Sequence, residues 1–466
     1  MMSKPAISAV LGVCLCLIGT VARADLYSAS AAAEKKDFAR AFDLYRELAE
    51  MGQPEAQENL AVMYVNGEGV KRDNVLGYAW ASMALENGGG EAAKGIVAQL
   101  EPHLNAAARL RVAELRSRFG TQALEKTLLP VLGVRVDPPN PPPTPECAMS
   151  KVANPDDYYP IEARNHGTSG DVLITNLAYG DGRAHDPRVT HSFPPDVFVV
   201  AGREVALRNV LTPKKVGGVA VPCEFKFKVK FSVRAAGQAD TLKKQIGATR
   251  EKAKQGDPMA QLAYAVVIEN RWDLAEKGEL PIWWYLKAAQ AGIPAAQHIV
   301  GAYALAGTYV SQDEAKGLLW LNKAASAGNP DAQNELANYY LKKSPDAVAL
   351  ASAVDWFGKS VEGGNREAQF HFAALLATAP DAALRDPALS LELIEKAKSD
   401  FGMNPIWFEI RAAAFAGKGD FENAQKDQET AVGKAKRLGW NTAPQQARLA
   451  EYKAGKPWNG DLFAFY

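Results

Sequence analysis

Two patterns of apolar and polar residues divide the chain. Over most of its length the pattern is that of short amphipathic helices joined by turns, such as those we predict at 318–327 and 332–341. In the middle the pattern becomes one of strands: residues 171–179 are rich in Val, Ile, Thr and Leu, and apolar and polar residues alternate over 224–233. We therefore expect a mainly α-helical protein with a small internal α+β domain.

The helical parts contain an internal repeat. A hexapeptide of Gly, any residue, usually Pro, any residue, Ala and Gln occurs five times, beginning at Gly52, Gly256, Gly292, Gly328 and Gly364. The last four glycines follow one another at intervals of 36 residues, whereas the first lies far upstream in a separate block. Such a period is typical of stacked helix pairs, since a single pair cannot bury its apolar face.

Each hexapeptide has the residues of a turn between two helices. Glycine accepts the left-handed conformation that ends a helix, Asp257 or Asn329 can cap the next helix, and proline fits its first turn. A small residue that lets two helices approach stands four positions after each glycine, at Ala56, Ala260, Ala296, Ala332 and Ala368. A tryptophan that can fill the wedge between helix pairs stands eight positions before Gly88 and before the last three hexapeptide glycines, at Trp80, Trp284, Trp320 and Trp356.

The spacing, the Ala-Gln step and the tryptophans resemble Sel-one-like repeats (SLR), a longer relative of the tetratricopeptide repeat. The resemblance covers 37 to about 120 and 250 to about 400. It implies an α-solenoid in two blocks, with a groove that binds a peptide or a partner domain. Residues 418–424 echo 36–41 and look like a tetratricopeptide turn, so we expect 401–466 to cap the solenoid, with the aromatic segment 458–466 docked in the last groove or frayed.

The region between the blocks resembles the C-terminal domain of TonB. Residues 137–145 contain six prolines and predict a semi-rigid linker before it. The resemblance is carried by Tyr159-Pro160-x-x-Ala163, Gly167, Gly170-x-Val172, Gly180-Asp181-Gly182, Ser192, Phe198, Ala201, Pro213 and Gly217. The aromatic step that the family has after its helix is missing at 208–213, so the strand there is expected to be poorly formed.

The resemblance to TonB implies that a partner peptide adds a strand to a sheet edge. The candidate edge is 223–233, and its candidate partner-binding residues are Phe225, Lys226, Phe227, Lys228, Val229 and Lys230. The lysines have a second explanation, because lysines on an edge strand also prevent non-specific pairing.

The first residues predict export. Lys4 is followed by an apolar stretch, and Ala22-Arg23-Ala24 has the small-x-small pattern of signal peptidase sites, so 1–24 is predicted to be a signal peptide; an uncleaved membrane anchor is the alternative. After cleavage two cysteines remain, Cys147 and Cys223, which in an oxidising compartment predict a disulfide, with two separate buried thiols as the alternative. The bond would close a loop of about 77 residues and stabilise by roughly 4 kcal/mol.

Composition and motifs narrow the function. Lys plus Arg equals Asp plus Glu, at 53 each, which argues against a nucleic-acid partner. No nucleotide loop, nucleophile elbow or zinc-binding helix pair is evident, so we assign no catalytic residue, cofactor or small-molecule substrate. One local group of residues has the side chains of a metal site: His166, His185 and His191, with Asp181 and Asp186. Their spacing along the chain is not that of metal ligands, so we expect exposed histidines and no metal.

The sequence thus predicts six segments: signal peptide 1–24, helical repeats 25–135, linker 136–147, TonB-like domain 148–235, helical repeats 236–400 and cap 401–466. The function that fits best is a non-enzymatic scaffold in the periplasm that binds protein or peptide partners of the cell envelope. One alternative is a TonB-type energy transducer, held in the inner membrane by a retained N-terminal helix and coupled to outer-membrane receptors. A cell-wall hydrolase is a weaker alternative.

Overall fold

The computed structural model describes residues 26–87, 89–131, 148–193, 197–221, 223–232, 238–270, 274–343, 347–460 and 462–463. The chain forms two compact units: one combines the chain up to Leu132 with Trp284–Lys323, and the other combines Gly133–Trp283 with Ala324–Tyr466. Within the described ranges, every helix is too short or too polar to traverse a bilayer. The predicted signal peptide, the linker and Cys147 lie outside the described residues.

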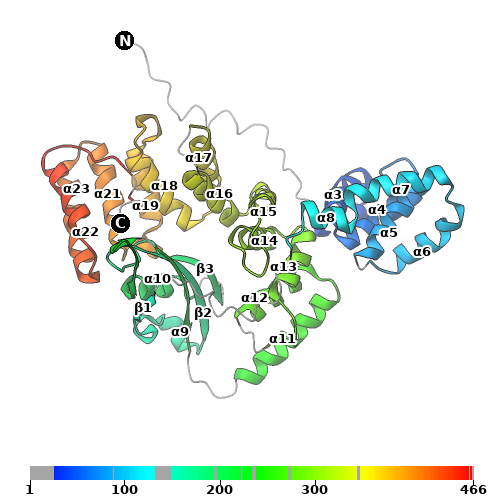
Figure 1. Cartoon of the computed structure of the whole chain (residues 1–466), viewed down its shortest axis with the longest axis horizontal. Coiled ribbons are helices and arrows are strands. Elements are labelled where there is room, and N and C mark those ends of the chain that lie inside the picture. The colour runs from blue at the N-terminus through cyan, green and yellow to red at the C-terminus, as the bar shows by residue number, and fades with distance from the viewer. Residues whose placement is uncertain are drawn as a thin grey trace, which may run out of the picture. The chain divides into compact units, whose positions relative to one another are not determined.

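The first unit is helical (Figure 1). From the first part of the chain come α2 (Leu26–Glu34), α3 (Phe38–Glu50), α4 (Pro54–Asn66), α5 (Asn74–Glu86), α6 (Glu91–Leu100), the 3₁₀ helix η2 (Glu101–His103), α7 (Ala106–Phe119) and α8 (Thr121–Thr127). From later in the chain come α13 (Pro281–Gln290), α14 (Pro294–Ala306) and α15 (Glu314–Ser326); the unit boundaries fall within α13 and α15.

The second unit contains the described strands and the remaining helices. Residues 148–231 supply β1 (Ala148–Lys151), η3 (Pro155–Tyr158), α9 (Ile161–Asn165), β2 (Gly170–Ala178), β3 (Arg188–Phe193), α10 (Val199–Arg208), β4 (Val210–Thr212), β5 (Lys214–Val216), β6 (Val219–Val221) and β7 (Cys223–Phe231). The helices are α11 (Gln238–Lys254), α12 (Pro258–Asn270), α16 (Pro330–Lys343), α17 (Ala347–Glu362), α18 (Arg366–Thr378), η5 (Ala382–Leu384), α19 (Pro387–Lys396), α20 (Lys398–Phe401), α21 (Pro405–Gly417), α22 (Phe421–Leu438) and α23 (Ala443–Lys453). The mainly α fold with a small α+β region is as predicted.

The five hexapeptides are helix–helix turns, as their residues predict. Their glycines all have positive φ, between 82° and 98°. At three of the turns Asp257, Asn329 or Asn365 accepts a hydrogen bond from the backbone N–H of the repeat alanine, at 2.7–2.9 Å. All five repeat alanines are buried, with at most 8% of their surface exposed. The glycine ends one helix and the capping side chain begins the next, so the turn is determined locally.

The glutamine that ends each hexapeptide has a structural role. In four turns its side-chain amide donates to the backbone carbonyl eight residues earlier, in the last turn of the preceding helix. These bonds join Gln57 to Ala49, Gln261 to Ala253, Gln297 to Ala289 and Gln333 to Ala325, at 2.9–3.2 Å. The last carbonyls of a helix lack a partner within the helix, and here each of the four accepts two hydrogen bonds, one from the glutamine and one from the backbone N–H of the turn glycine, at 2.9–3.1 Å.

The repeat tryptophans fill the core with one exception. Trp80, Trp284 and Trp320 are 3%, 6% and 0% exposed, as predicted. Trp356 is half-buried, and the fully buried ring at this point of α17 belongs to the next residue, Phe357. A shift of one position in a helix turns the side chain by about 100°, which accounts for the exchange of roles.

Helix α15 holds the end of α8 within the first unit. Lys316 is buried, and its ammonium donates to the carbonyls of Glu125 and Leu129 at 2.6 and 2.7 Å. The indole N–H of Trp320 donates to the carbonyl of Leu128 at 2.9 Å. These three carbonyls follow or end α8, where the helix leaves acceptors unpaired and its dipole favours a cation. The sequence therefore builds one unit from segments about 190 residues apart.

The main sheet has the strand order β3-β2-β7 and is antiparallel throughout. Strands β2 and β7 each begin one residue before the strand that the sequence predicted, and β7 is at an edge, as predicted. The segment after α10 forms the three-residue β4, which pairs with β1 outside the main sheet. The short strand agrees with the missing aromatic step at 208–213.

Candidate functional site

The edge strand β7 has one buried and one exposed face. Phe227, Val229 and Phe231 are at most 9% exposed and pack in a core with Tyr159 and Phe198. Lys228 and Lys230 are exposed, and Lys226 is half-buried. Alternate residues of a strand point to opposite faces, so the apolar set fixes the register and turns all three lysines outward.

The core under β7 explains the Tyr-Pro-x-x-Ala motif. The ring of Tyr159 packs edge-on against Phe198 and Phe231, at centroid distances of 5.5 and 5.7 Å, and its hydroxyl donates to the carbonyl of Thr168. Ala163 is 5% exposed in the same cluster. The motif thus supports the inner face of the edge strand.

Helix α10 covers the same inner face at close range. A Cβ added to Gly202 would lie 3.0 Å from Cγ1 of Val172 on β2, so a larger residue here would push the helix away from the sheet. On this support β7 pairs with β2 over nine residues without a shift in register.

The outer face of the sheet is basic. Lys226, Thr175 and Arg188 share one register level across the three strands. At the next levels Lys228 lies opposite Leu173 and Lys230 opposite Asp171. Asp171 lies 3.6 Å from the Lys228 ammonium, so part of the basic charge is neutralised. On its other side β7 has no neighbouring strand among the described residues.

The predicted site residues therefore occupy one edge. Phe225 is half-buried at the start of β7, beside the buried Cys223, which is 4% exposed and pairs with Ala178. Cys147 lies outside the described residues, so the disulfide stays a prediction.

The expectation of exposed histidines is wrong for His185. His185 is fully buried, and its Nε2 lies 2.9 Å from Oδ2 of Asp181. Its ring stacks on Trp440 with a centroid distance of 3.7 Å and an interplanar angle of 2°. His166 is exposed as expected, and the side chain of His191 is not among those described. The partners that bury His185 include Trp440, which is distant in the sequence, so the local spacing of the histidines does not predict this burial.

A second buried pair lies beside the first. Oδ2 of Asp186 lies 3.1 Å from Nε2 of His371, on α18, and 3.3 Å from Nε of Arg188. Burial raises the pKa of Asp186, but the contacts with His371 and Arg188 outweigh it and hold the pKa well below its ordinary value. The carboxylate is therefore ionised and fixes the end of the sheet to α18.

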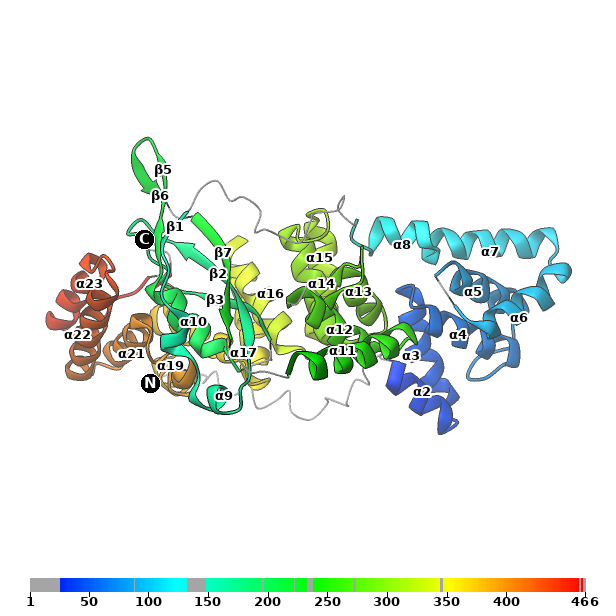
Figure 2. The same ribbon diagram turned by 90° about the horizontal axis from the view of Figure 1, so that it is seen from below.

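We call this region the joint: Asp181, His185 and Asp186, together with His371, Asn404, Trp440 and Asn441 of the later helices and loops. Asn404 donates to the carbonyl of His185, and the backbone N–H of Asn441 donates to Asp181, both at 2.9 Å. Both views show α10 beside α19 and α21 (Figures 1 and 2). The joint binds the sheet to the helices through side chains, and no group of residues suited to a metal ion is found in the described ranges.

Arg203 on α10 makes a second connection to the later helices. Its guanidinium lies 3.3 Å from a carboxylate oxygen of Glu367 and 3.5 Å from one of Asp400. It also lies over the ring of Phe401, 4.2 Å from the centroid. Because Arg203 is 8% exposed at its side chain, these contacts are largely shielded from solvent.

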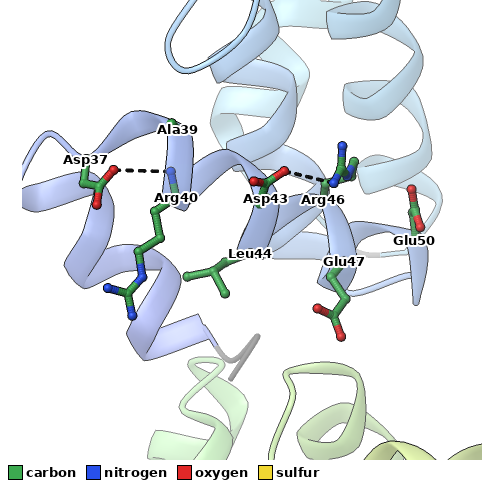
Figure 3. Close-up of a pocket in the computed structure, with 8 residues that line it drawn as sticks. All are labelled: Asp37, Ala39, Arg40, Asp43, Leu44, Arg46, Glu47 and Glu50. Atoms are coloured by element: carbon green, nitrogen blue, oxygen red, sulfur yellow. Dashed lines mark hydrogen bonds and ion pairs between the residues drawn. The ribbon is translucent and has the colours of Figure 1, made fainter. Parts of the chain in front are cut away.

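A depression of about 660 Å³ lies on the first unit, lined by α3 and the residue that caps it: Asp37, Ala39, Arg40, Asp43, Leu44, Arg46, Glu47 and Glu50 (Figure 3). Asp37 caps the helix at the N–H of Arg40, and Asp43 pairs with Arg46 at 2.9 Å. These are ordinary contacts of a solvated helix face, and we assign no chemistry to them.

Two families match parts of the chain. The Sel1 repeat family matches residues 22–53, 54–89, 282–293, 294–329 and 330–365. The family described as Gram-negative bacterial TonB protein C-terminal matches residues 155–233. The turn at Gly256 lies outside the matched repeats, but its positive φ and its Gln261–Ala253 bond are those of the matched ones. Repeat geometry thus extends beyond the matched segments.

Two solved structures are similar at low identity. A Sel1 repeat protein from Oxalobacter formigenes is 14% identical, with 80% of this chain and 98% of that chain covered and a TM-score of 0.31. A protective antigen of uropathogenic Escherichia coli strains with an SLR fold is 18% identical, with 92% and 84% covered and a TM-score of 0.34. None of the curated proteins matches the chain.

Proposed function

We propose that this chain, which carries five Sel1 repeats and a TonB C-terminal domain, is an exported, non-enzymatic scaffold that binds protein or peptide partners of the cell envelope. The repeats indicate a protein–protein interaction scaffold. The observation that carries the finer proposal is the nine-residue edge strand β7, which is paired with β2 on one side and has no strand on the other among the described residues.

Binding at β7 would occur by strand addition. Alternate N–H and C=O groups of an edge strand point away from its neighbour and can pair with an extended peptide. Lys226, Lys228 and Lys230 stand beside this edge and favour a partner segment with acidic residues. The same lysines disfavour the pairing of two identical edges, which suits a scaffold that must not aggregate.

The energy transducer remains the second candidate, on the strength of the TonB-family match. Two features argue for docking instead of force transmission. The proline-rich stretch of nine residues reaches only about 30 Å at ~3.1 Å per residue. The TonB domain is also internal, with helices on both sides. Sequencing the N-terminus of the mature protein separates the two: a start near Asp25 supports the scaffold, and a retained, membrane-bound N-terminus supports the transducer.

Partner capture tests the edge. We expect the full mature chain to retain envelope proteins, and the double variant Lys226→Glu, Lys230→Glu to retain them at least about tenfold less, because opposite charge would now repel an acidic segment. Lys252→Glu, on the exposed face of α11, is the matched control and should bind like the parent chain. Capture unchanged in the double variant would contradict the role of β7, and no capture by the parent chain would contradict the scaffold.

We also propose a disulfide between Cys147 and Cys223. An exported chain meets an oxidising compartment, and Cys223 is buried at the start of β7, where a cross-link would anchor the edge strand. Alkylation of the unfolded mature chain should label no cysteine before reduction and both after it, measured by mass. Two labels before reduction would show separate thiols.

A further inference from the structure

The last described segment of the chain packs against the joint. We call residues 458–463 the strap; residues 458–460 and 462–463 of it are described. Leu462 is 2% exposed, and Trp458 and Phe463 are partly buried against the same apolar cluster as α18 and α21. The docking expected for this aromatic segment is thus found up to Phe463.

Three hydrogen bonds hold the described residues of the strap. The backbone N–H of Gly460 donates to the carbonyl of Thr378 at 2.8 Å, and Arg385 donates to the side-chain oxygen of Asn459 at 2.7 Å. The hydroxyl of Tyr179 donates to the carbonyl of Phe463 at 3.0 Å. Contacts to backbone together with buried side chains are how proteins hold extended peptides.

The walls of the strap's site come from two distant parts of the chain. The ring of Phe463 lies 5.1 Å from His371 and 5.8 Å from Phe370, both on α18. Tyr179 follows β2, and its ring lies 4.6 Å from that of His185 in the joint. The site therefore exists because β2 and α18 are fixed by the joint, and the strap fills it without belonging to either element.

The strap contains a turn at Gly460. A Cβ added to Gly460 would lie 2.7 Å from the ring of Trp458, so the backbone folds back over the indole at this point. The indole in turn lies under Arg448, with the guanidinium 5.0 Å from the ring centroid. A bound segment must therefore have glycine two residues after its tryptophan and an apolar pair after that.

We propose that the site between Tyr179 and α18 is a peptide-binding site, that the strap occupies it as an internal ligand, and that a partner segment containing a Leu–aromatic pair competes for it. The proposal rests on the scaffold function and adds a second binding surface to the β7 edge. A strap that serves only to brace the joint is the competing explanation.

The test uses a fluorescently labelled peptide with the sequence of residues 456–463 and two forms of the mature chain. One form ends after Pro457; the other is complete. We expect the shortened chain to bind the peptide and the complete chain to bind it about tenfold more weakly, because a tethered segment has an effective concentration of about 1 mM and outcompetes a peptide with a Kd near 0.1 mM. Equal binding by both forms would overturn the proposal.

Two controls make the result specific, and a second variant can replace the shortened chain. A peptide with Gly460→Ala should lose most of its binding to the shortened chain, since the added Cβ meets the indole. Tyr179→Phe in the shortened chain should weaken binding several-fold, because one hydrogen bond is lost. If the shortened chain does not fold, judged by near-UV circular dichroism, the complete chain with Leu462→Ala and Phe463→Ala replaces it and should gain binding relative to the parent chain.

No binding by a folded form with an empty site would show that the strap only braces the joint. The capture experiment on β7 is independent of this result: envelope proteins retained by the parent chain and lost by Lys226→Glu, Lys230→Glu would leave the scaffold function standing when the strap proposal fails. No capture together with no peptide binding would contradict both.

Discussion

At the scale of single residues, His185 and Asp181 couple the stability of the joint to pH. Burial lowers the pKa of His185 from its ordinary value of 6.5, and the contact with Asp181 opposes this only in part. Burial raises the pKa of Asp181, but hydrogen bonds from His185 and from the backbone of Asn441 and Arg183 leave it lowered overall. His185 is therefore neutral and donates its Nε2 proton to an ionised Asp181.

A histidine with a lowered pKa binds fewer protons in the folded chain than in the unfolded chain. The free energy of unfolding should therefore fall as pH falls through about 6.5, and fall again below about 4 as the unfolded state protonates Asp181 and Asp186. We expect His185→Phe, which keeps the stacking on Trp440, to lose about 1–3 kcal/mol at pH 7.5 and to flatten the slope between pH 5 and 6.5. Urea unfolding at several pH values measures both. The exposed His166→Gln should keep the parent slope; a parent curve that is flat over this range would refute the prediction.

At the scale of elements, the repeat turn depends on its glutamine. Gln333 is 6% exposed and donates to the carbonyl of Ala325 at 2.9 Å. Gln333→Leu keeps the apolar stem but removes one of the two hydrogen bonds to that carbonyl, which also accepts from the backbone N–H of Gly328 at 2.9 Å, so we expect a loss of about 0.5–1.5 kcal/mol in the free energy of unfolding. Gln446→Leu, on the exposed face of α23, is the control and should change stability by less than about 0.5 kcal/mol. Equal effects of the two substitutions would mean that the bond to Ala325 contributes nothing.

At the scale of the whole molecule, the first unit is completed by a helix that the sequence places after the small domain. Lys316→Met keeps much of the side-chain volume but removes both bonds from the ammonium to the carbonyls of Glu125 and Leu129. We expect a loss of about 2–4 kcal/mol and faster hydrogen exchange of the amides of Leu128 and Leu129, which bond to Leu124.

Lys323→Met is the matched control on the same helix, because Lys323 is half-buried and α15 carries it away from the capping position of Lys316. It should leave the exchange of Leu128 and Leu129 unchanged. If Lys316→Met also leaves it unchanged, the contact between α15 and α8 does not stabilise the unit.

The features of this protein that have local causes could be predicted from the residues alone. The turn glycines, the buried alanines and the alternation along β7 could be predicted because the backbone conformation of a turn, the approach of two adjacent helices and the face of a strand depend on residues within a few positions. The edge position of β7 also followed, through the resemblance to TonB. The half-burial of Trp356 did not, because the core of the second unit selected the neighbouring Phe357.

The surroundings of the sheet depend on contacts between residues far apart in the chain. His185 is buried by Trp440 and Asn404, and Asp186 is paired with His371, at separations of 185 residues or more. Lys316 reaches carbonyls that precede it by 187 and 191 residues. A period or a motif contains no information about such contacts, since they form when separately determined elements meet and must satisfy each other's buried polar groups. The repeats and the small domain could therefore be predicted from the sequence. The joint, the contacts of Lys316 and the site of the strap became visible only in the folded structure.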